Sequence, residues 1–277
     1  MIVLLYCQGE NEMKDLIKRL WARAVREKAK DIARPAFTKN EKIRLKHELE
    51  IISQTKTAEQ IISFINQADE ARKTGRFYTK GAANCSFLLY TVGATTINPM
   101  LIGSQFERFI NPLMDGSPYY EIASGTPKEL STEEEQMLLN ELIIKRAVEH
   151  GFIKDEQLKR STDHPSASSY QFVEDVLFES NGNIIWQEQV IELLYRMGGF
   201  SYAESDLMRR DSAKGYTFDG KWFATRRKRF MDNALHAGYD YYFADKFFRY
   251  IFEANMHIYL KAHVAAVVLN SKNQPTS

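Results

Sequence analysis

The chain has 277 residues, of which 44% are hydrophobic, and its 37 basic and 36 acidic residues give a formal net charge of +1. This balance argues against an overall electrostatic attraction to nucleic acid, and the length is enough for one large or two modest domains. No apolar run approaches the roughly 20 residues that span a bilayer, and the start of the chain lacks the basic residues of a signal peptide, so we expect a cytoplasmic protein. Cys7 and Cys85 form neither a C-x-x-C pair nor a metal-ligand spacing with histidine, which favours two buried apolar residues.

In the first third of the chain, the capping residues and the spacing of apolar residues mainly predict helices. Residues 2–6 are the exception, because we interpret their short apolar run, I-V-L-L-Y, as a strand. Thr57, followed three residues later by Gln60, has the spacing of a capping box, and apolar residues then recur at helical intervals from 61 to 65. Gly75 is placed to end that helix.

The middle of the chain is its least informative part. A short strand is predicted at 119–122, and Ser131 followed by Glu134 again has capping-box spacing. Residues 162–169, T-D-H-P-S-A-S-S, have the composition of a loop or linker. This segment predicts a break between an N-terminal and a C-terminal part.

The last third is predicted to be helical. Ser201 and Glu204 have the spacing of a third capping box, and aromatic residues recur at helical intervals from 243 to 252. For the aromatic residues between 239 and 259 we favour core packing over base stacking. The expected fold class is mainly α, or α+β with a small sheet remnant.

Charge is distributed unevenly along the chain. Basic residues outnumber acidic ones by 12 to 7 between residues 12 and 50 and by 8 to 3 between 206 and 229, whereas acids outnumber bases by 9 to 6 between 121 and 160. Basic clusters are typical of phosphate-contacting surfaces, and also of ordinary solvated helix faces. From charge alone we favour the solvated face.

One motif has a specific resemblance. The segment 103–123 contains F-E-R-F-I-N-P at 106–112, followed by Gly116, Ser117 and Pro118. It resembles the bacterial family C DNA polymerases, the DNA polymerase III α subunits, where F-E-R-F-L-N-P precedes G-M-P-D-(I/F)-D-(I/V)-D. The resemblance implies a strand that carries metal-binding aspartates in that family.

At those aspartates this chain departs from the family pattern. Tyr119 and Glu121 stand at the two metal-binding positions, and Ala123 stands at the next aspartate. Nucleotidyl transfer needs converging carboxylates to hold two divalent ions, and a neutral phenol does not replace one. The family's later V-K-F-D-F-L-G run has no counterpart here. We therefore expect no catalytic residues, no metal site and no cofactor, with Mg²⁺ required only if polymerase activity is retained.

A second resemblance lies upstream. The run I-R-L-K-H-E-L-E-I-I at 43–52 is similar to a family helix, and 77–95 is similar to the family's Gly-rich turn beside the incoming triphosphate. On this alignment Lys80 replaces an arginine, Gly81 is kept, and Ser86 stands at the final serine. The resemblance implies that Lys80, Gly81 and Ser86 contact nucleotide phosphates, although two glycines and a hydroxyl of the family turn are missing.

The C-terminal part resembles the fingers of the same family. N-G-N-I-I-W-Q-E-Q-V begins at Asn181, F-S-Y-A-E-S-D-L-M-R-R-D-S-A-K fills 200–214, and Y-L-K-A-H-V-A-A-V-V-L-N-S fills 259–271. The resemblance implies that certain basic residues meet the triphosphate, and the local basic clusters suggest DNA contacts. The nucleotide or phosphate candidates are Arg209, Arg210 and Lys214, and the DNA candidates are Arg226, Arg227, Lys228, Arg229 and Lys261.

Taken together, the resemblance implies a polymerase III α palm-like plus helical fingers-like architecture. We predict a palm-like region at 1–123, a divergent connecting segment at 124–181 and a fingers-like region at 182–277. A fainter likeness extends over 11–34.

Three functions remain open at this point. The first is a catalytically degenerate α-like protein that binds nucleic acid or nucleotide phosphates in DNA replication or repair. The second is a DNA-directed DNA polymerase whose activity is retained, or supplied by a complementary chain. The third is an interaction protein that engages replication proteins by mimicking part of the α subunit. The expected partners are DNA or nucleotide phosphates, with replication proteins or a complementary polymerase chain as alternatives, and no membrane.

Overall fold

The computed structural model of the chain describes residues 2–75, 77–114, 118–125, 132–159, 171–213 and 220–270, with side chains except at 2–10, 135, 136 and 222. The chain divides into two compact units, Met1–Glu129 with Ala265–Lys272 and Leu130–Val264 with Asn273–Ser277. The predicted palm-like, connecting and fingers-like regions remain predictions, because a division into compact units does not say which unit is a palm and which is fingers. Over the part of the chain that the structure describes, no helix is long and apolar enough to cross a bilayer.

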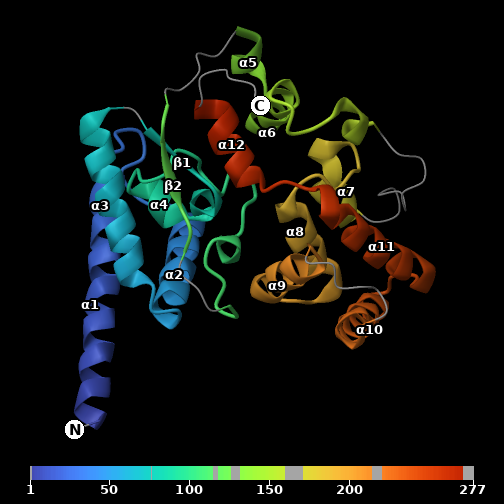
Figure 1. Ribbon diagram of the computed structural model, residues 1–277, viewed down its shortest axis with the longest axis horizontal. Coiled ribbons are helices and arrows are strands. Elements are labelled where there is room, and N and C mark those ends of the chain that lie inside the picture. The colour runs from blue at the N-terminus through green and yellow to red at the C-terminus, as the bar shows by residue number, and fades with distance from the viewer. Residues whose placement is uncertain are drawn as a thin grey trace. The chain divides into compact units, whose positions relative to one another are not determined.

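The first unit is built mainly of helices (Figure 1). Its side-chain core is fully buried at Leu45, Ile52, Ile61, Phe64 and Leu88. The elements are α1 (Ile2–Lys28), α2 (Lys39–Gln54), α3 (Ala58–Thr74), β1 (Phe77–Lys80), the 3₁₀ turn η1 (Ala82–Cys85), α4 (Phe87–Thr91), the 3₁₀ turn η2 (Phe106–Arg108) and β2 (Glu121–Ser124).

Strands β1 and β2 form a two-stranded antiparallel sheet, in which Phe77 lies opposite Ser124 and Lys80 lies opposite Glu121. The strand predicted at 119–122 is confirmed with a shift of two residues, since β2 starts at Glu121. Strand β1 was not predicted, although its F-Y-T-K run has strong β formers at three of its four positions.

The strand predicted at 2–6 is wrong, because α1 already begins at Ile2. A short apolar run does not distinguish a strand from a helical turn, and here a long helix-forming sequence follows it. Extending an existing helix adds one hydrogen bond per residue, whereas a strand needs a partner to pair with. The run therefore continues the helix.

The helix caps differ in outcome. The capping box predicted at Thr57 is wrong, since Thr57 makes no side-chain cap and its hydroxyl lies 3.0 Å from the hydroxyl of Thr55. The box at Ser201 is confirmed, with the backbone N–H of Glu204 donating to its hydroxyl over 3.2 Å. A box at Thr38 and Glu41 caps α2 and was missed. Ser131 lies outside the described residues.

The second unit is helical around a large aromatic and aliphatic cluster that includes Leu193, Phe230, Phe247 and Phe248. The core packing predicted for this aromatic stretch is confirmed for the buried face of α11, while Tyr242 is 81% exposed. The helices are α5 (Thr132–Gln136), α6 (Leu139–Glu149), α7 (Gln171–Leu177), α8 (Gln187–Gly198), α9 (Tyr202–Ala213), α10 (Lys221–His236) and α11 (Tyr241–Ala254).

Short 3₁₀ turns and a last helix complete the second unit. The turns are η3 (Asp155–Leu158), η5 (Phe178–Ser180) and η6 (Asn255–His257). Helix α12 (Lys261–Asn270) starts in the second unit, and its residues from Ala265 onward belong to the first. Cys85 is fully buried as expected, whereas the side chain of Cys7 and the linker predicted at 162–169 lie outside the described residues.

Candidate functional site

The positions that resemble the polymerase metal centre lie at the start of β2. Glu121 is directly opposite Lys80 in the sheet, and the Lys80 Nζ atom lies 3.3 Å from its Oε1 atom. Tyr119 is 70% exposed, and a Cβ built on Gly81 would lie 3.9 Å from its ring. Gly81 has φ +85° and ψ −162°, a combination that is open essentially only to glycine. The sheet thus brings together Lys80, Gly81, Tyr119 and Glu121.

This donor set does not fit a pair of magnesium ions. Magnesium takes hard oxygen ligands, and the one carboxylate at these positions, Glu121, already faces the ammonium group of Lys80. Tyr119 offers a neutral phenol and Ala123 offers no donor. Among the described residues, no three His, Cys, Asp or Glu side chains converge to hold a metal ion. Asp115, Gly116 and Ser117 lie outside the described residues.

Ser86 serves as the cap of a helix. Its hydroxyl accepts from the backbone N–H of Leu89 over 3.2 Å and donates to the Glu48 carboxylate over 2.8 Å, and the side chain is 1% exposed. The N–H groups of Phe87 and Leu88 also donate to Glu48, over 2.7 and 2.9 Å. The backbone N–H groups at the start of α4 therefore already bind a carboxylate of the protein itself. The resemblance places a phosphate at this position.

Glu48 is held in turn by Arg44. The Arg44 Nε atom donates to Glu48 over 2.7 Å, and the same guanidinium donates to the carbonyl of Cys85 over 2.7 Å. Glu48 is completely buried, and its carboxylate accepts from Arg44, from the Ser86 hydroxyl and from two backbone N–H groups, which offset the loss of water. The Gly-rich turn is thereby fixed to α2 from inside.

The F-E-R-F segment at 106–109, which resembles the family motif, is also fixed to α2. His47 Nε2 lies 2.7 Å from Glu107 Oε1, and Glu107 is nearly buried while the His47 side chain is 45% exposed. The hydrogen bond to Glu107 raises the pKa of His47 above its ordinary value, and partial burial offsets part of that rise. A protonated His47 therefore favours this contact.

Arg209 and Arg210 converge on one carboxylate in α9. Arg209 donates to Asp206 Oδ1 from two nitrogens at 3.1 Å, and Arg210 Nε donates to Asp206 Oδ2 over 2.6 Å. Asp206 is fully buried, the Arg209 side chain is 6% exposed and that of Arg210 is 26% exposed. Of the two, only Arg210 presents appreciable surface to a ligand, and Lys214 lies outside the described residues.

The basic run in α10 is largely paired with acids of the same unit. Arg227 donates to Asp245 over 2.6 Å, Lys228 donates to Asp232 over 2.6 Å, and Arg229 donates to Glu204 over 2.6 Å. These contacts reduce the net field of the cluster, and the Arg229 contact lowers the pKa of Glu204. Arg226 is half-buried, and this burial lowers the pKa of its guanidinium.

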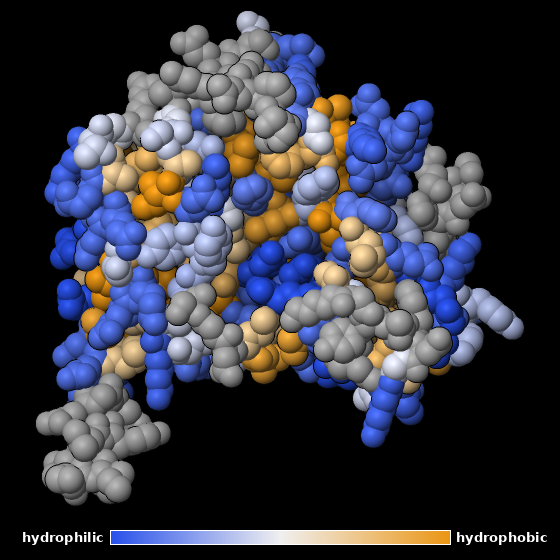
Figure 2. All heavy atoms as spheres, viewed as in Figure 1, coloured by the Kyte–Doolittle hydropathy of each residue, from blue (hydrophilic) through white to orange (hydrophobic). Residues whose placement is uncertain are grey.

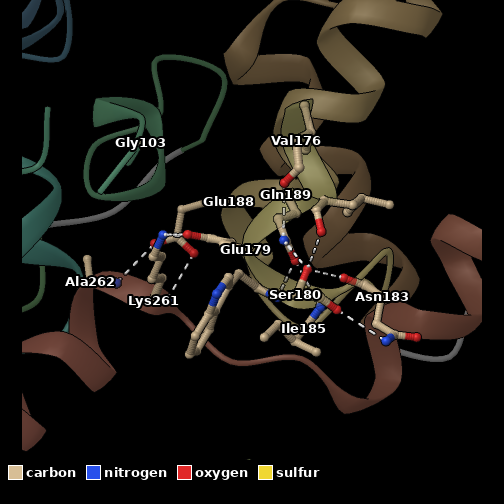
Figure 3. Close-up of polar contacts among 12 residues, drawn as sticks. Gly103, Val176, Glu179, Ser180, Asn183, Ile185, Glu188, Gln189, Lys261 and Ala262 are labelled. Carbon is tan, nitrogen blue, oxygen red and sulfur yellow. Dashed lines mark hydrogen bonds and ion pairs between the residues drawn. The ribbon is translucent and has the colours of Figure 1, made fainter. Parts of the chain in front are cut away.

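Lys261 is buried at the start of α12, and Figure 3 shows it beside Glu179 and Glu188. Its Nζ atom lies 2.7 and 2.6 Å from the two carboxylate oxygens of Glu179, and the residue is 2% exposed. The carboxylate of Glu188 accepts from the backbone N–H groups of Lys261 and Ala262 over 2.9 and 3.1 Å. Lys261 therefore lies inside the unit rather than at a surface that DNA would contact.

The Q-E-Q-V segment fixes the loop before α8. The side-chain oxygen of Gln189 accepts from the N–H of Ile185 over 2.9 Å, and its amide nitrogen donates to the hydroxyl of Ser180 over 2.8 Å (Figure 3). Ser180 in turn donates to the carbonyl of Asn183 over 2.5 Å. Together with Glu188, Gln189 makes this segment a buried scaffold.

Three acidic residues that were not predicted as site residues organise these sites. Asp206 had a readable signal, because it precedes Arg209 and Arg210 by three and four residues, the spacing of helical ion pairs. Glu48 had the same signal toward Arg44, four residues before it, but none toward Ser86, which is 38 residues away. Glu107 had no such signal, because His47 is 60 residues away.

Comparison with known proteins assigns both parts of the chain to one family. Residues 17–123 match the family model described as the bacterial DNA polymerase III alpha NTPase domain, and residues 144–238 match the bacterial DNA polymerase III alpha subunit finger domain. The first match begins within the stretch where the sequence showed only a faint likeness.

Curated DNA polymerase III alpha subunits are similar over the same kind of span. The protein of Helicobacter pylori strain ATCC 700392 / 26695 is 29% identical over 122 residues, which cover 44% of this chain and 10% of the relative. That of Treponema pallidum strain Nichols is 32% identical over 97 residues, covering 34% and 8%. The chain thus spans about a tenth of the length of these relatives. These matches, with the helical fold and its small sheet, show that the chain belongs to the bacterial DNA polymerase III alpha family.

Proposed function

We propose that this chain is a catalytically degenerate member of the DNA polymerase III alpha family. On this proposal it binds nucleic acid or nucleotide phosphates in a cytoplasmic replication or repair context, without a metal centre of its own. The observation that carries the proposal is the donor set at the start of β2, where Glu121 is the one carboxylate and lies 3.3 Å from Lys80. Tyr119 and Ala123 stand at the other two positions, so a pair of metal ions lacks ligands whether the contact with Lys80 is open or closed.

Burial separates the candidate phosphate ligands into two groups. Exposed ion pairs contribute little free energy, so Lys80, Lys228 and Arg229 can exchange their acidic partners for a phosphate at small cost. Arg209 and Lys261 are themselves almost completely buried, each beside a carboxylate, and we assign them a structural role. Arg210, with its partly exposed side chain, belongs to the exchangeable group.

Primer extension tests the loss of catalysis. The full chain is incubated with a primer-template duplex, deoxynucleotides and either Mg²⁺ or Mn²⁺, with an active DNA polymerase as positive control. We expect no incorporation. Incorporation that disappears in Glu121→Gln would refute the proposed degeneracy.

A salt titration tests phosphate binding. Affinity for a labelled primer-template duplex is measured by fluorescence anisotropy at several salt concentrations, where each neutralised phosphate contributes about −0.9 to the slope of log K against log salt. The double variant Lys228→Ala/Arg229→Ala is expected to reduce the steepness of the slope by about 2. The matched control is Lys42→Ala/Lys46→Ala, at two exposed lysines of α2. Binding that is absent or independent of salt would contradict the proposal.

A second candidate is one component of a split polymerase. It is favoured by the match of the chain to two regions of one family, together with the substitutions at the metal-binding positions. A complementary chain would then supply the missing carboxylates. The test is primer extension by the chain mixed with the product of a neighbouring reading frame that encodes the missing polymerase segments. Activity of the mixture, absent from either chain alone, would replace the first proposal with this one.

A further inference from the structure

No candidate residue named so far lies on the exposed face of α11. The opposite face of this helix packs into the core of the second unit. The helix lies outside residues 144–238, which match the finger-domain model, and outside the fingers-like motifs of the sequence. The family resemblance therefore assigns this face no role. Its exposed residues are Tyr241, Tyr242, Lys246, Arg249 and Glu253.

Two tyrosines lie side by side at the start of this face. Tyr242 is 81% exposed and Tyr241 is 48% exposed, and their rings meet at 90° with centroids 5.9 Å apart. The hydroxyl of Tyr241 accepts from Arg227 of α10 over 3.4 Å. Tyr241 is thus attached to the neighbouring helix, whereas most of the Tyr242 ring is in the solvent. An exposed ring of this kind is a surface on which a planar group can stack.

Two basic residues follow Tyr242 on the same side of the helix. Lys246 and Arg249 come four and seven residues later, so they return to the same face, and Arg249 lies about 10 Å from Tyr242 along the helix axis. Among the described residues, Lys246 has no acidic partner within ion-pair distance. Arg249 lies 3.5 Å from Asp245, and its side chain is 54% exposed. This exposed contact contributes little free energy and can be exchanged for another anion.

The charges on this face favour an anionic ligand. Among the described residues, Asp245 is the one carboxylate within ion-pair distance of Arg227 or Arg249, and it lies closer to Arg227, at 2.6 Å. Glu253 lies one turn beyond Arg249, away from the tyrosines. No exposed residue of α11 is aliphatic, and on the face shown in Figure 2 hydrophilic side chains predominate around this helix. A ligand of this face therefore needs negative charge and a planar group.

We propose that the exposed face of α11 binds single-stranded nucleic acid. A base stacks on the ring of Tyr242, and phosphates next to that base contact Lys246 and Arg249. Sites for single strands combine aromatic side chains with basic residues in this manner. The bases of a duplex are stacked on one another, so their faces are not open to Tyr242. The proposal rests on the proposed binding of nucleic acid, and it names the single strand as the form that this face binds.

The probe is a fluorescein-labelled oligothymidylate of about 16 nucleotides, and its binding to the full chain is measured by fluorescence anisotropy. Tyr242→Ala is expected to weaken binding at least about fivefold, which is the lower end of the contribution of one stacked base. Tyr242→Phe keeps the ring and should bind like the wild type. Tyr242→Leu keeps an apolar side chain without a ring, so it should bind like Tyr242→Ala. The side chain is 81% exposed, so these substitutions should leave the fold intact.

A double variant tests the phosphate contacts. On a single strand, each neutralised phosphate contributes about −0.7 to the slope of log K against log salt, so Lys246→Ala/Arg249→Ala should reduce the steepness by about 1.4. The matched control is Lys42→Ala/Lys46→Ala, at two exposed lysines of α2. This control should leave the slope unchanged. A slope that does not respond to Lys246→Ala/Arg249→Ala overturns the proposal.

A blunt duplex measured in parallel separates this inference from the proposed function. We expect Tyr242→Ala to leave the affinity for the duplex unchanged. If the wild type binds the duplex but not the oligothymidylate, the inference fails and the proposed function stands, and if it binds neither, both fail. Binding of the oligothymidylate by Tyr242→Ala or Tyr242→Leu as tightly as by the wild type also overturns the inference. An equal loss of both ligands in Tyr242→Ala does so too, because stacking on an unpaired base would not explain it.

Discussion

The two units treat comparable charged residues differently. In the first unit, Lys80 and Glu121 meet on an exposed sheet, with side-chain exposures of 31% and 49%. In the second, Arg209 and Asp206 meet in the interior, with exposures of 6% and 0%. Lys80, Glu121 and Arg209 stand at positions that the family resemblance places near nucleotide or metal. An exposed pair can be opened at little cost, whereas a buried pair is part of the scaffold.

The largest expected effect tests the buried side of this comparison. Asp206→Ala leaves Arg209 buried without its carboxylate, so we expect a loss of about 3–5 kcal/mol in the free energy of unfolding of the second unit. Urea unfolding, together with hydrogen exchange of the amides in α9, measures the loss. Arg210→Ala, which removes the more exposed partner, should cost less. A loss below about 1 kcal/mol for Asp206→Ala would mean that the Arg209–Asp206 pair contributes no more than an exposed ion pair does.

The first unit also has a buried charged residue, Glu48, and its replacement is expected to have a smaller effect on stability. Glu48→Gln replaces a carboxylate that accepts from Ser86, Phe87, Leu88 and Arg44 by an amide whose NH₂ group faces donors. We expect a loss of about 2 kcal/mol, because hydrogen bonds to a charged group are the stronger ones. Glu50→Gln, at an exposed position of the same helix, serves as control and should change stability by less than about 0.5 kcal/mol.

The exposed pair should give a weaker coupling. A double-mutant cycle with Lys80→Ala and Glu121→Ala is expected to yield about 0.2–1 kcal/mol, decreasing as salt screens the contact. Thermal or urea unfolding of the four proteins provides the cycle. A coupling energy above about 2 kcal/mol that does not respond to salt would remove the distinction between the two units.

The smallest effect is a pH dependence in the first unit. The folded pKa of His47 is raised from its ordinary 6.5 by Glu107, so the contact stabilises the fold fully below pH 6.5 and is lost as pH rises through the raised pKa. Because His47 is half-exposed, we expect a loss of only about 0.5 kcal/mol. The measurement is unfolding stability at a series of pH values. His47→Gln should flatten the profile in this window, and an unchanged slope would show that another group is responsible.

Features of the fold could be predicted from the sequence where they depend on residues close together along the chain. The Ser201 capping box depends on residues three positions apart, and the buried stripe of α11 follows helical periodicity. The run at 2–6 was assigned wrongly because five apolar residues fit a strand and a helix equally well. Thr57 does not cap its helix, because its hydroxyl forms a hydrogen bond with the hydroxyl of Thr55 instead.

The sequence by itself determined the family, the mainly helical composition and the replacement of carboxylates by Tyr119 and Ala123, because all of these are properties of residue order. Only the tertiary structure decided the partners of the remaining charges. Lys80 lies opposite Glu121, and Glu48 lies beneath Ser86, 38 residues away along the chain. Burial then sets the free energy of each pair, and burial results from how distant segments pack. For this reason the Lys80–Glu121 pair is an exposed contact, whereas Glu48 and Asp206 belong to buried scaffolds.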